Sequence, residues 1–589
     1  MKFTNCSTAA LAIASVGLAT TLSSPASACG GLFCNGATPV NQAAERIVFA
    51  VNDDNTVTAA IEILYEGPAE SFAWILPVPE GEVTVAVSSK QALDSIDQQS
   101  NPIYQLNTTV DQDSCNDDDG FFNFGFSGGA GESANSVPLA AAVAAAPPSV
   151  QVVDSGNAGP YVWEQIMVNA EGEDPVEVAL KWLTDNDYDV TEDTAERLLP
   201  YLEKDFNLVA FKLNKQGSQG SIRPVLLTYQ GTQAMIPIQP TAVAANEDMG
   251  IKVWVLGDSR SVALNYANLE LNEAAINWFN AGSNYNDVVI AAANEAGGHG
   301  FVTEQSGPAQ EFAPNIYPEE TALNWQGLQT GVFSSVEDFL NAAASRFRDL
   351  DGVNDVLSDP RLVPLREGAT REQFLNCVTC YFDSDVAVRN NAFPETPYVQ
   401  GEDPLDEFDT DAFLVEFERL VIQPLRDTQA MFENSNTSTR FYTTLSPDEM
   451  DMDPTFDFND ELGSLDNLHT AERTIFCTDN GNEWSITLPQ GTVVSGQDST
   501  WPLSEADVGT IPSNFRVLSM STRGEGEVLT DNADTIQTAL TDNGSGESED
   551  EIEQRANGGC SVSGSGSGST WWAIAAALGL IGWRRRTQI

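Results

Sequence analysis

Three residues in this chain have the types that nucleophilic hydrolysis of an ester or amide requires. Ser259 follows a strand-like run, Ile251–Leu256, while Asp466 and His469 lie close together much further along the chain. In such a site Ser259 would attack the carbonyl carbon, His469 would accept its proton and Asp466 would orient the imidazole ring. This chemistry requires a fold that brings position 259 to positions 466–469.

The segments around these residues resemble those of SGNH-type hydrolases. Gly257-Asp258-Ser259 is similar to their nucleophile block, Gly282-Ser283-Asn284 to their Gly-x-Asn block and Asp466-Asn467-Leu468-His469 to their Asp-x-x-His block. However, the nucleophile block normally opens that domain, whereas here it lies near the middle of the chain. A strand followed by a polar turn is the preferred interpretation, and a secreted serine hydrolase is the alternative.

Cys377-Val378-Thr379-Cys380 has the spacing of a thiol–disulfide redox centre, in which a helix N-terminus stabilises one thiolate. Here a predicted helix, Thr370–Leu375, precedes the motif and places the first cysteine late in a helix. A zinc site would need two further ligands, and the available ones are distant cysteines and two histidines. We therefore predict a structural disulfide.

The remaining cysteines indicate further disulfides. Cys6 lies in an N-terminal export signal and Cys560 in the C-terminal tail, which leaves an even number in an exported chain. Spacing alone does not decide the connectivity. The expected pairs are Cys29–Cys34, Cys377–Cys380 and Cys115–Cys477.

The segment Asp349-Leu350-Asp351-Gly352 resembles part of a calcium-binding loop. An EF-hand loop needs oxygen ligands at its first, third and fifth positions and a Glu at the twelfth. Counted from Asp349, the fifth position is Val353 and the twelfth is Pro360. A solvated acidic loop is the preferred interpretation. Calcium on Asp349, Asp351 and Asp355 is the alternative, and no other cofactor is expected.

The negative charge of the chain excludes polyanionic partners. With 86 acidic and 27 basic residues, the net charge is −59, and no Lys occurs after Lys252. Such a surface repels nucleic acid and anionic lipid. This composition is typical of a protein that stays soluble in high salt, where counterions screen the repulsion between its own charges. The alternative is an acidic surface that stores divalent cations.

Met1–Ala28 has the organisation of a secretory signal peptide. Lys2 supplies the charge, Ala9–Leu22 the apolar run and Ala26-Ser27-Ala28 the small residues before the cut at Cys29. Lipidation of Cys29 is the alternative, although Ala26 stands where a lipobox favours Leu. The export machinery and a signal peptidase are therefore expected partners.

The C-terminal tail combines a small-residue motif, a spacer, an apolar stretch and a basic stop. The motif is Gly558-Gly559-Cys560, the apolar stretch is Trp571–Trp583, and Arg584-Arg585-Arg586 closes it. As a helix, this stretch would span about 20 Å, against about 30 Å of bilayer hydrocarbon. It is short for a permanent anchor and long enough for a transient one.

This tail resembles the bacterial GlyGly-CTERM and MYXO-CTERM sorting signals. The resemblance implies that an intramembrane protease removes the helix and that the protein passes to the cell surface. Cys560 would then be the residue modified or exposed at the cut. An ordinary single-pass anchor at 571–583 is the alternative.

Alternating apolar and polar residues predict a mainly antiparallel sheet in the N-terminal half. One predicted face consists of Val57, Ala59, Ile61, Ile63 and Tyr65. Further strands are predicted at Ser71–Val78, Leu208–Leu213, Pro224–Tyr229, Ala234–Ile238 and Ile251–Leu256. Helices are predicted at Lys90–Gln98, Pro175–Thr184, Thr191–Leu199 and Glu273–Phe279.

Helices dominate after about Gly307. Ser334-Ser335-Val336-Glu337 has the pattern of a capping box, and Asp411–Phe432 has helical spacing with a kink expected at Pro424. Short strands return at Glu483–Leu488 and Phe515–Met520.

The predicted fold class is α+β, with a helix-rich second half. The expected parts are a signal peptide at 1–28, a β-rich domain at 29–306 with a low-complexity insertion at about 110–160, a helix-rich domain with short β segments at 307–529, a disordered acidic Ser/Gly stalk at 530–559, and a tail at 560–589 with a short transmembrane helix at 571–583.

Several longer blocks resemble the bacterial family called domain of unknown function 2330. They are Ile47–Val51, Tyr65–Pro79, Val253–Gly257, Ala296–Glu304 and Ser438–Pro454. The resemblance covers most of 29–470 and implies an exported bacterial protein, often tethered, with no assigned activity. It supplies no catalytic residues.

Together these features predict a non-enzymatic protein of a bacterial cell envelope or surface, with a role in structure, adhesion or binding. Its expected partners are the export machinery, a C-terminal sorting protease and, at least transiently, the membrane. Nucleic acid is not expected as a partner, and the extracellular ligand is left unidentified. The alternatives are the serine hydrolase and a calcium-binding surface protein.

Overall fold

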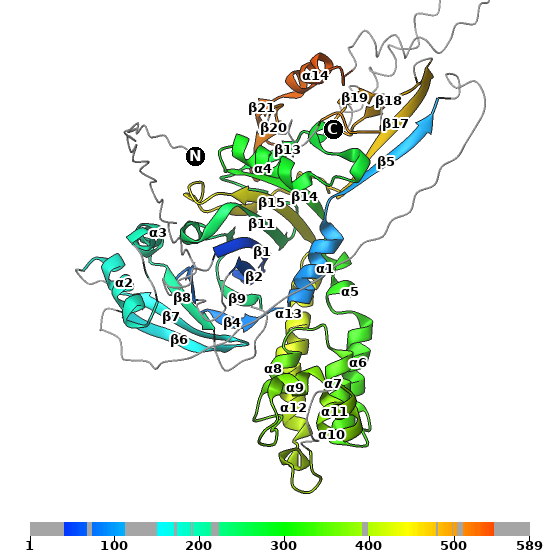
Figure 1. Ribbon diagram of the computed structural model, residues 1–589. Helices are drawn as coiled ribbons and strands as arrows, with labels where there is room; N and C mark the ends of the chain where they lie inside the picture. Colours follow the sequence, from blue (N-terminus) through cyan, green and yellow to red (C-terminus); the bar gives the residue numbers. More distant parts are fainter. Residues whose placement is uncertain are drawn as a thin grey trace, which may run out of the picture.

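A computed structural model of the chain describes residues 41–66, 73–111, 150–169, 173–188, 190, 192–213, 223–390, 398–478, 481–497, 499–503 and 510–546. The described part is a mixed α+β structure, as predicted. A long sheet runs through the middle, a smaller sheet lies to one side, and a helical lobe projects away from both (Figure 1).

The long sheet brings together segments that are distant in sequence, and in the described residues it has ten strands. Most neighbours are antiparallel, but β1 pairs in parallel with β11 and β13 with β14. From edge to edge the strands are β21 (Glu527–Asp531), β20 (Asn514–Ser519), β13 (Ala267–Leu271), β14 (Gly300–Pro308), β15 (Thr437–Leu445), β11 (Ala245–Gly257), β1 (Asn41–Val51), β2 (Thr56–Glu66), β9 (Val225–Gln230) and β4 (Thr84–Val87).

The alternation of side chains along β1 explains how this sheet is buried on both faces. Ile47 and Phe49 belong to a core shared with the smaller sheet, whereas Val48 and Ala50 belong to a core shared with helices. The predicted face of β2 joins the first of these cores through Val57, Ala59, Ile61 and Ile63. The Tyr65 side chain lies outside the described residues.

The smaller sheet packs one face against β1 and β2 and the other against two helices. Asp174 caps the first of these helices by accepting a hydrogen bond from the Val176 amide, with Pro175 in the first turn. The sheet comprises β3 (Ala73–Val78), β8 (Asn207–Leu213), β7 (Tyr161–Val168) and β6 (Val150–Ala158), and the helices are α2 (Pro175–Asp185) and α3 (Glu192–Leu202).

Two further sheets extend the body. One consists of β19 (Val493–Gly496), β18 (Gly481–Thr487), β17 (Leu468–Thr478) and β5 (Ile103–Val110). The other consists of β10 (Ala234–Met235), β16 (Thr455–Phe458) and β12 (Ser261–Ala263), and the short helix η2 (Gln239–Val243) follows β10. The predicted strand Ala234–Ile238 is thus shorter, since a helical turn begins at Gln239.

The helical lobe is inserted between β14 and β15, which are neighbours in the long sheet (Figure 1). Its own core includes Trp325 stacked on Phe417. The helices that join and form the lobe are η5 (Ala309–Glu311), α5 (Ala313–Ile316), α6 (Glu319–Thr330), α7 (Val336–Arg346), α8 (Val353–Ser358), α9 (Arg371–Asn376), α10 (Val378–Phe382), α11 (Ser384–Asn390), η6 (Pro404–Glu407), α12 (Thr410–Phe417), η7 (Glu418–Ile422) and α13 (Gln423–Glu433). Strands from both sides of the predicted division at 306/307 share one sheet, so that division does not follow the sheet.

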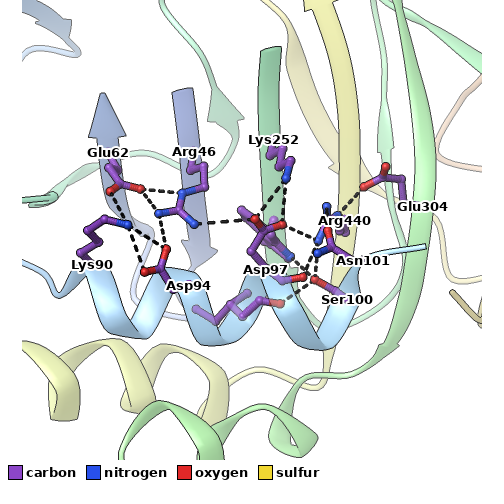
Figure 2. Close-up of polar contacts among 12 residues, drawn as sticks. Arg46, Glu62, Lys90, Asp94, Asp97, Ser100, Asn101, Lys252, Glu304 and Arg440 are labelled. Atoms are coloured by element: carbon purple, nitrogen blue, oxygen red, sulfur yellow. Dashed lines mark hydrogen bonds and ion pairs between the residues drawn. The ribbon is translucent and has the colours of Figure 1, made fainter. Parts of the chain in front are cut away.

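A partly buried ionic network holds α1 (Lys90–Ser100) across the long sheet (Figure 2). Arg46 of β1 pairs with Glu62 of β2 and, at 2.7 Å, with Asp94 of α1. Further along the helix, Asp97 accepts from Lys252 Nζ of β11 at 3.1 Å. We call this set, with the contacts of Arg440 described next, the α1 network.

Arg440 of β15 is the most enclosed cation of the α1 network, since its side chain is 1% exposed. It pairs with Glu304 of β14 and, at 2.9 Å, with Asp97. It also donates to Ser100 Oγ at 2.9 Å and to Asn101 Oδ1 at 2.7 Å (Figure 2). These ionic and hydrogen-bonding partners are supplied by β14 and by α1 with its C-terminal cap, and the guanidinium also lies over the Trp254 ring of β11, 5.1 Å from its centroid.

Two predicted helices take a different form. Glu273–Phe279 contains only the turns η3 (Glu273–Ala275) and η4 (Trp278–Asn280), because Asn272 and Asn277 each cap a new turn; the α-helix here is α4 (Tyr285–Glu295). α3 continues past Leu199 to Leu202 with Pro200 inside it. Pro200 removes one helical hydrogen bond, and only Tyr201 and Leu202 of the helix follow it.

The region predicted as one helix kinked at Pro424 is two α-helices joined by a π-helical stretch. Pro424 lies in the first turn of α13, directly after the π-helical stretch Glu418–Ile422. At the start of α7, Ser335 is the cap and accepts from the Asp338 amide.

The stalk predicted from 530 begins in folded structure. Its first residues complete β21, and α14 (Ala533–Asp542) follows, with Ile536 and Leu540 buried in a core. These two apolar residues, spaced four apart on one helix face, account for the docking of α14. Residues 547–589 lie outside the described part.

Replacing Arg440 with Met tests the α1 network. The variant keeps an apolar stem but leaves Glu304 and Asp97 without their buried cation, so we expect a loss of about 3–5 kcal/mol in unfolding free energy. Urea denaturation followed by tryptophan emission measures it. Lys181→Met removes a pair that is 62% and 46% exposed and should cost at most about 0.5 kcal/mol. Equal losses in the two variants would contradict a structural role for the network.

Candidate functional site

A bulge at the start of β1 sets the direction of Glu45. The pairing of β1 with both β2 and β11 shifts register between Gln42 and Ala44. A bulge re-aims the side chains that follow it. From Ala44 onward, alternation places Glu45 on the same face as Ile47 and Arg46 on the α1 face.

On the face of Glu45, a cavity of about 250 Å³ lies between β1 and β2 of the long sheet and β3 of the smaller sheet. Its wall is mainly apolar and includes four aromatic side chains: Phe49, Trp74, Phe206 and Tyr229. Among the described lining residues, Glu45 and Tyr229 are the titratable ones. An apolar cavity of about 150 Å³ accommodates benzene, so this cavity has room for a small aromatic ligand.

Glu45 is buried without a counter-charge among the described residues. The residue is 6% exposed, and Gln42 Nε2 donates to its Oε2 at 3.4 Å. Desolvation raises the pKa of the Glu45 carboxyl to about 7, while the Gln42 contact acts weakly in the opposite direction. The carboxyl therefore changes charge near neutral pH inside an apolar cavity.

Glu45→Gln should change the dependence of stability on pH. Because the folded pKa is about 7 against a usual 4.5, ionisation favours the unfolded chain, and this penalty develops as pH rises from about 4.5 through 7. We expect the variant to match the wild type near pH 4 and to exceed it at pH 8 by about 3 kcal/mol. Urea midpoints at both pH values measure this difference.

Glu203→Gln, at an exposed position, is the matched control and should leave both midpoints unchanged. A loss of stability in Glu45→Gln at pH 8 would show that the ionised carboxyl has a stabilising partner.

The structure does not assemble the predicted hydrolase site from its three residues. Asp466 Oδ1 accepts from the Leu468 amide at 3.1 Å, and His469 Nδ1 instead lies 2.7 Å from Glu273 Oε1. The His469 ring stacks on Tyr104. Among the described residues, no hydrogen bond joins Ser259 to His469.

Packing explains the other residues of that pattern. Ser259 lies in the turn after β11, and a Cβ added to Gly257 would lie 2.2 Å from the Phe458 ring. Asn284 accepts from the Asn277 amide at 2.8 Å and donates to Ala275 O at 2.9 Å. Gly257 and Asn284 therefore each have a local structural reason.

The acidic loop considered for calcium lies where the helical lobe meets α1. Asp351 Oδ2 accepts from the Lys90 amide at 2.6 Å, which caps α1 from outside the helix, and the Asp351 amide donates to Gln91 Oε1 at 3.1 Å. Asp349 is exposed and Asp355 lies in the first turn of α8. Over the described residues, no group of three or more His, Cys, Asp or Glu side chains is placed to hold a metal ion.

The predicted local disulfide between Cys377 and Cys380 is present, at the start of α10. Cys477, near the end of β17, is also disulfide-bonded. Its expected partner, Cys115, lies outside the described residues, as do Cys29 and Cys34.

Both ends with predicted sorting functions also lie outside the described residues. They include Ala28 and Cys29 at one end and Gly558, Gly559 and Cys560 at the other. In the portion that is described, no helix has the length and apolar character needed to cross a bilayer. The predicted helix at 571–583 is not part of that portion.

The sequence reasoning missed Glu45 as a site residue. The sequence signal is weak: Glu45 and Arg46 precede a wholly apolar run, Ile47–Val51, and acidic residues are rarely buried without a partner. The bulge and the partner sheet that enclose it have no comparable sequence signal.

Fold and cavity define a class of protein: a mixed α+β body in which two sheets enclose an apolar cavity with one carboxyl. The chain belongs to the family described as an uncharacterized protein conserved in bacteria, DUF2330, which matches residues 23–349. This confirms the family expected from the sequence, and the matched span ends before the block at 438–454. No curated protein and no solved structure matches the chain.

Proposed function

We propose that this chain is an exported bacterial binding protein without catalytic activity and that the Glu45 cavity is its ligand-binding site. The observation that supports this is the combination of aromatic walls with one buried carboxyl that has no counter-charge among the described residues. A mostly apolar pocket with few polar groups is typical of small-molecule sites. Burying a carboxyl without a partner weakens a fold. A ligand that pairs with the Glu45 carboxyl would offset this cost and would account for an acidic residue at this position.

The contacts of the three residues considered for catalysis also favour a binding role over hydrolysis. Asp466 and His469 are engaged with different partners, and Ser259 lies in the half-buried turn after β11. Nucleophilic catalysis needs the nucleophile and its base within hydrogen-bonding reach. We therefore favour a binding protein over the hydrolase.

Filling the cavity tests the binding site. We expect 2-phenylethanol to bind the wild type, as detected by ligand-observed NMR and by a change in tryptophan emission, since Trp74 lines the cavity. In Ala59→Phe the added ring occupies the cavity, and the affinity should fall at least about tenfold, or about 1.4 kcal/mol. Met235→Trp is a second blocking variant, at a half-buried lining position.

Val332→Phe adds a similar ring at a fully exposed position, 101% exposed, and should bind like the wild type. Equal binding by all the variants would locate the probe elsewhere and reject the cavity as the site. No binding by the wild type would also count against the proposal.

We further propose that the protein is exported through Met1–Ala28 and sorted to the cell surface through Gly558–Arg586. The order of small-residue motif, short apolar stretch and basic stop supports the sorting proposal. Intact-mass measurement of surface-fraction protein should show a C-terminus at or near Cys560 and an N-terminus after Ala28. A surface protein that retains Ile589 would favour a permanent anchor instead.

A further inference from the structure

We propose that the ligand of the Glu45 cavity is an organic cation: a small apolar or aromatic body that carries one ammonium group, which pairs with the Glu45 carboxylate. This inference rests on the proposed binding function and specifies the chemical class of the ligand.

The first support is the missing counter-charge. The residues paired beside Glu45 on β2 and β11 are Ile63 and Ile251, both apolar and in the same core. The other titratable group lining the cavity is Tyr229, which carries no positive charge. The charged residues next to these positions point to the opposite face, where they join the α1 network: Arg46, Glu62 and Lys252. Among the described residues, the two cations next to these positions, Arg46 and Lys252, are thus already paired on the opposite face of the sheet.

The second support is the composition of the wall. Trp74, Tyr229, Phe49 and Phe206 line the cavity. The faces of aromatic rings attract cations, and aromatic surroundings are a recurring way to bind ammonium groups. A carboxylate that neutralises the charge and rings that contact the apolar body are together complementary to an organic cation. A carboxylate-bearing ligand would instead meet a like charge.

The third support is the long-range field of the protein. A net charge of −59 raises the local concentration of cations around the chain. This attraction is not specific to the cavity, and salt screens it. It therefore favours delivery of a cation, while Glu45 supplies the specific contact.

The test compares two probes of nearly equal shape, 2-phenylethylammonium and 2-phenylethanol, by titration calorimetry of the full chain in high salt. At pH 8 we expect the ammonium compound to bind the wild type at least about tenfold more tightly than the alcohol. Because Glu45 must be ionised to pair, the ammonium affinity should fall about tenfold between pH 8 and pH 6. The affinity for the alcohol should change little over this range.

Glu45→Gln should remove both the preference for the ammonium compound and its pH dependence, and it should still bind the alcohol. Ala59→Phe should weaken both probes, which shows that they occupy the cavity. The pH dependence of ammonium binding to the wild type tests the role of the Glu45 carboxylate without any variant.

The outcomes separate this inference from the proposed function. If the alcohol binds in the cavity but the ammonium compound has no advantage, or if Glu45→Gln keeps that advantage, the cation inference is overturned and the binding site stands. If neither probe binds the wild type, both are overturned.

Discussion

The α1 network is the constraint on which the rest of this structure depends. A buried Arg or Asp must be paired, because its desolvation costs far more than a surface position would. Here α1 pairs directly with residues of β1, β11 and β15, and the arginines of β1 and β15 pair in turn with Glu62 of β2 and Glu304 of β14, so that widely separated parts of the chain are joined. The order of strands and the position of the helix are therefore coupled. A helix shifted by one turn would leave several charges unpaired at once.

Two neighbouring residues of β1, Glu45 and Arg46, place their charges in opposite environments on the two faces of the strand. Arg46 is surrounded by carboxylates on the α1 face, whereas Glu45 is surrounded by apolar side chains on the cavity face. The paired charge supports the fold, and the unpaired charge weakens it near and above neutral pH. Unsatisfied charges of this kind concentrate at functional sites, which is why the cavity, and not the larger α1 network, is the candidate site.

The helical lobe is attached through the same helix. Asp351 of the lobe caps the N-terminus of α1, and Ser88, just before α1, contacts Thr428 of α13 at 2.7 Å. A long insertion between neighbouring strands is tolerated when its ends lie close together. The Cys377–Cys380 bond and the aromatic core of the lobe give it local stability of its own.

Local patterns in the sequence were sufficient for the mixed α+β class, for the apolar face of β2 and for α1 and α2, since alternation along a strand and the spacing of apolar residues along a helix depend on near neighbours. They failed at Glu273–Phe279, where polar caps divide an apolar segment, and at the start of the stalk, where burial of Ile536 and Leu540 orders a helix. For Glu45 the sequence determined only a carboxyl two residues before an apolar run, Ile47–Val51. Tertiary structure decided the rest, because strand order, the bulge register and the enclosing sheet depend on contacts between distant segments.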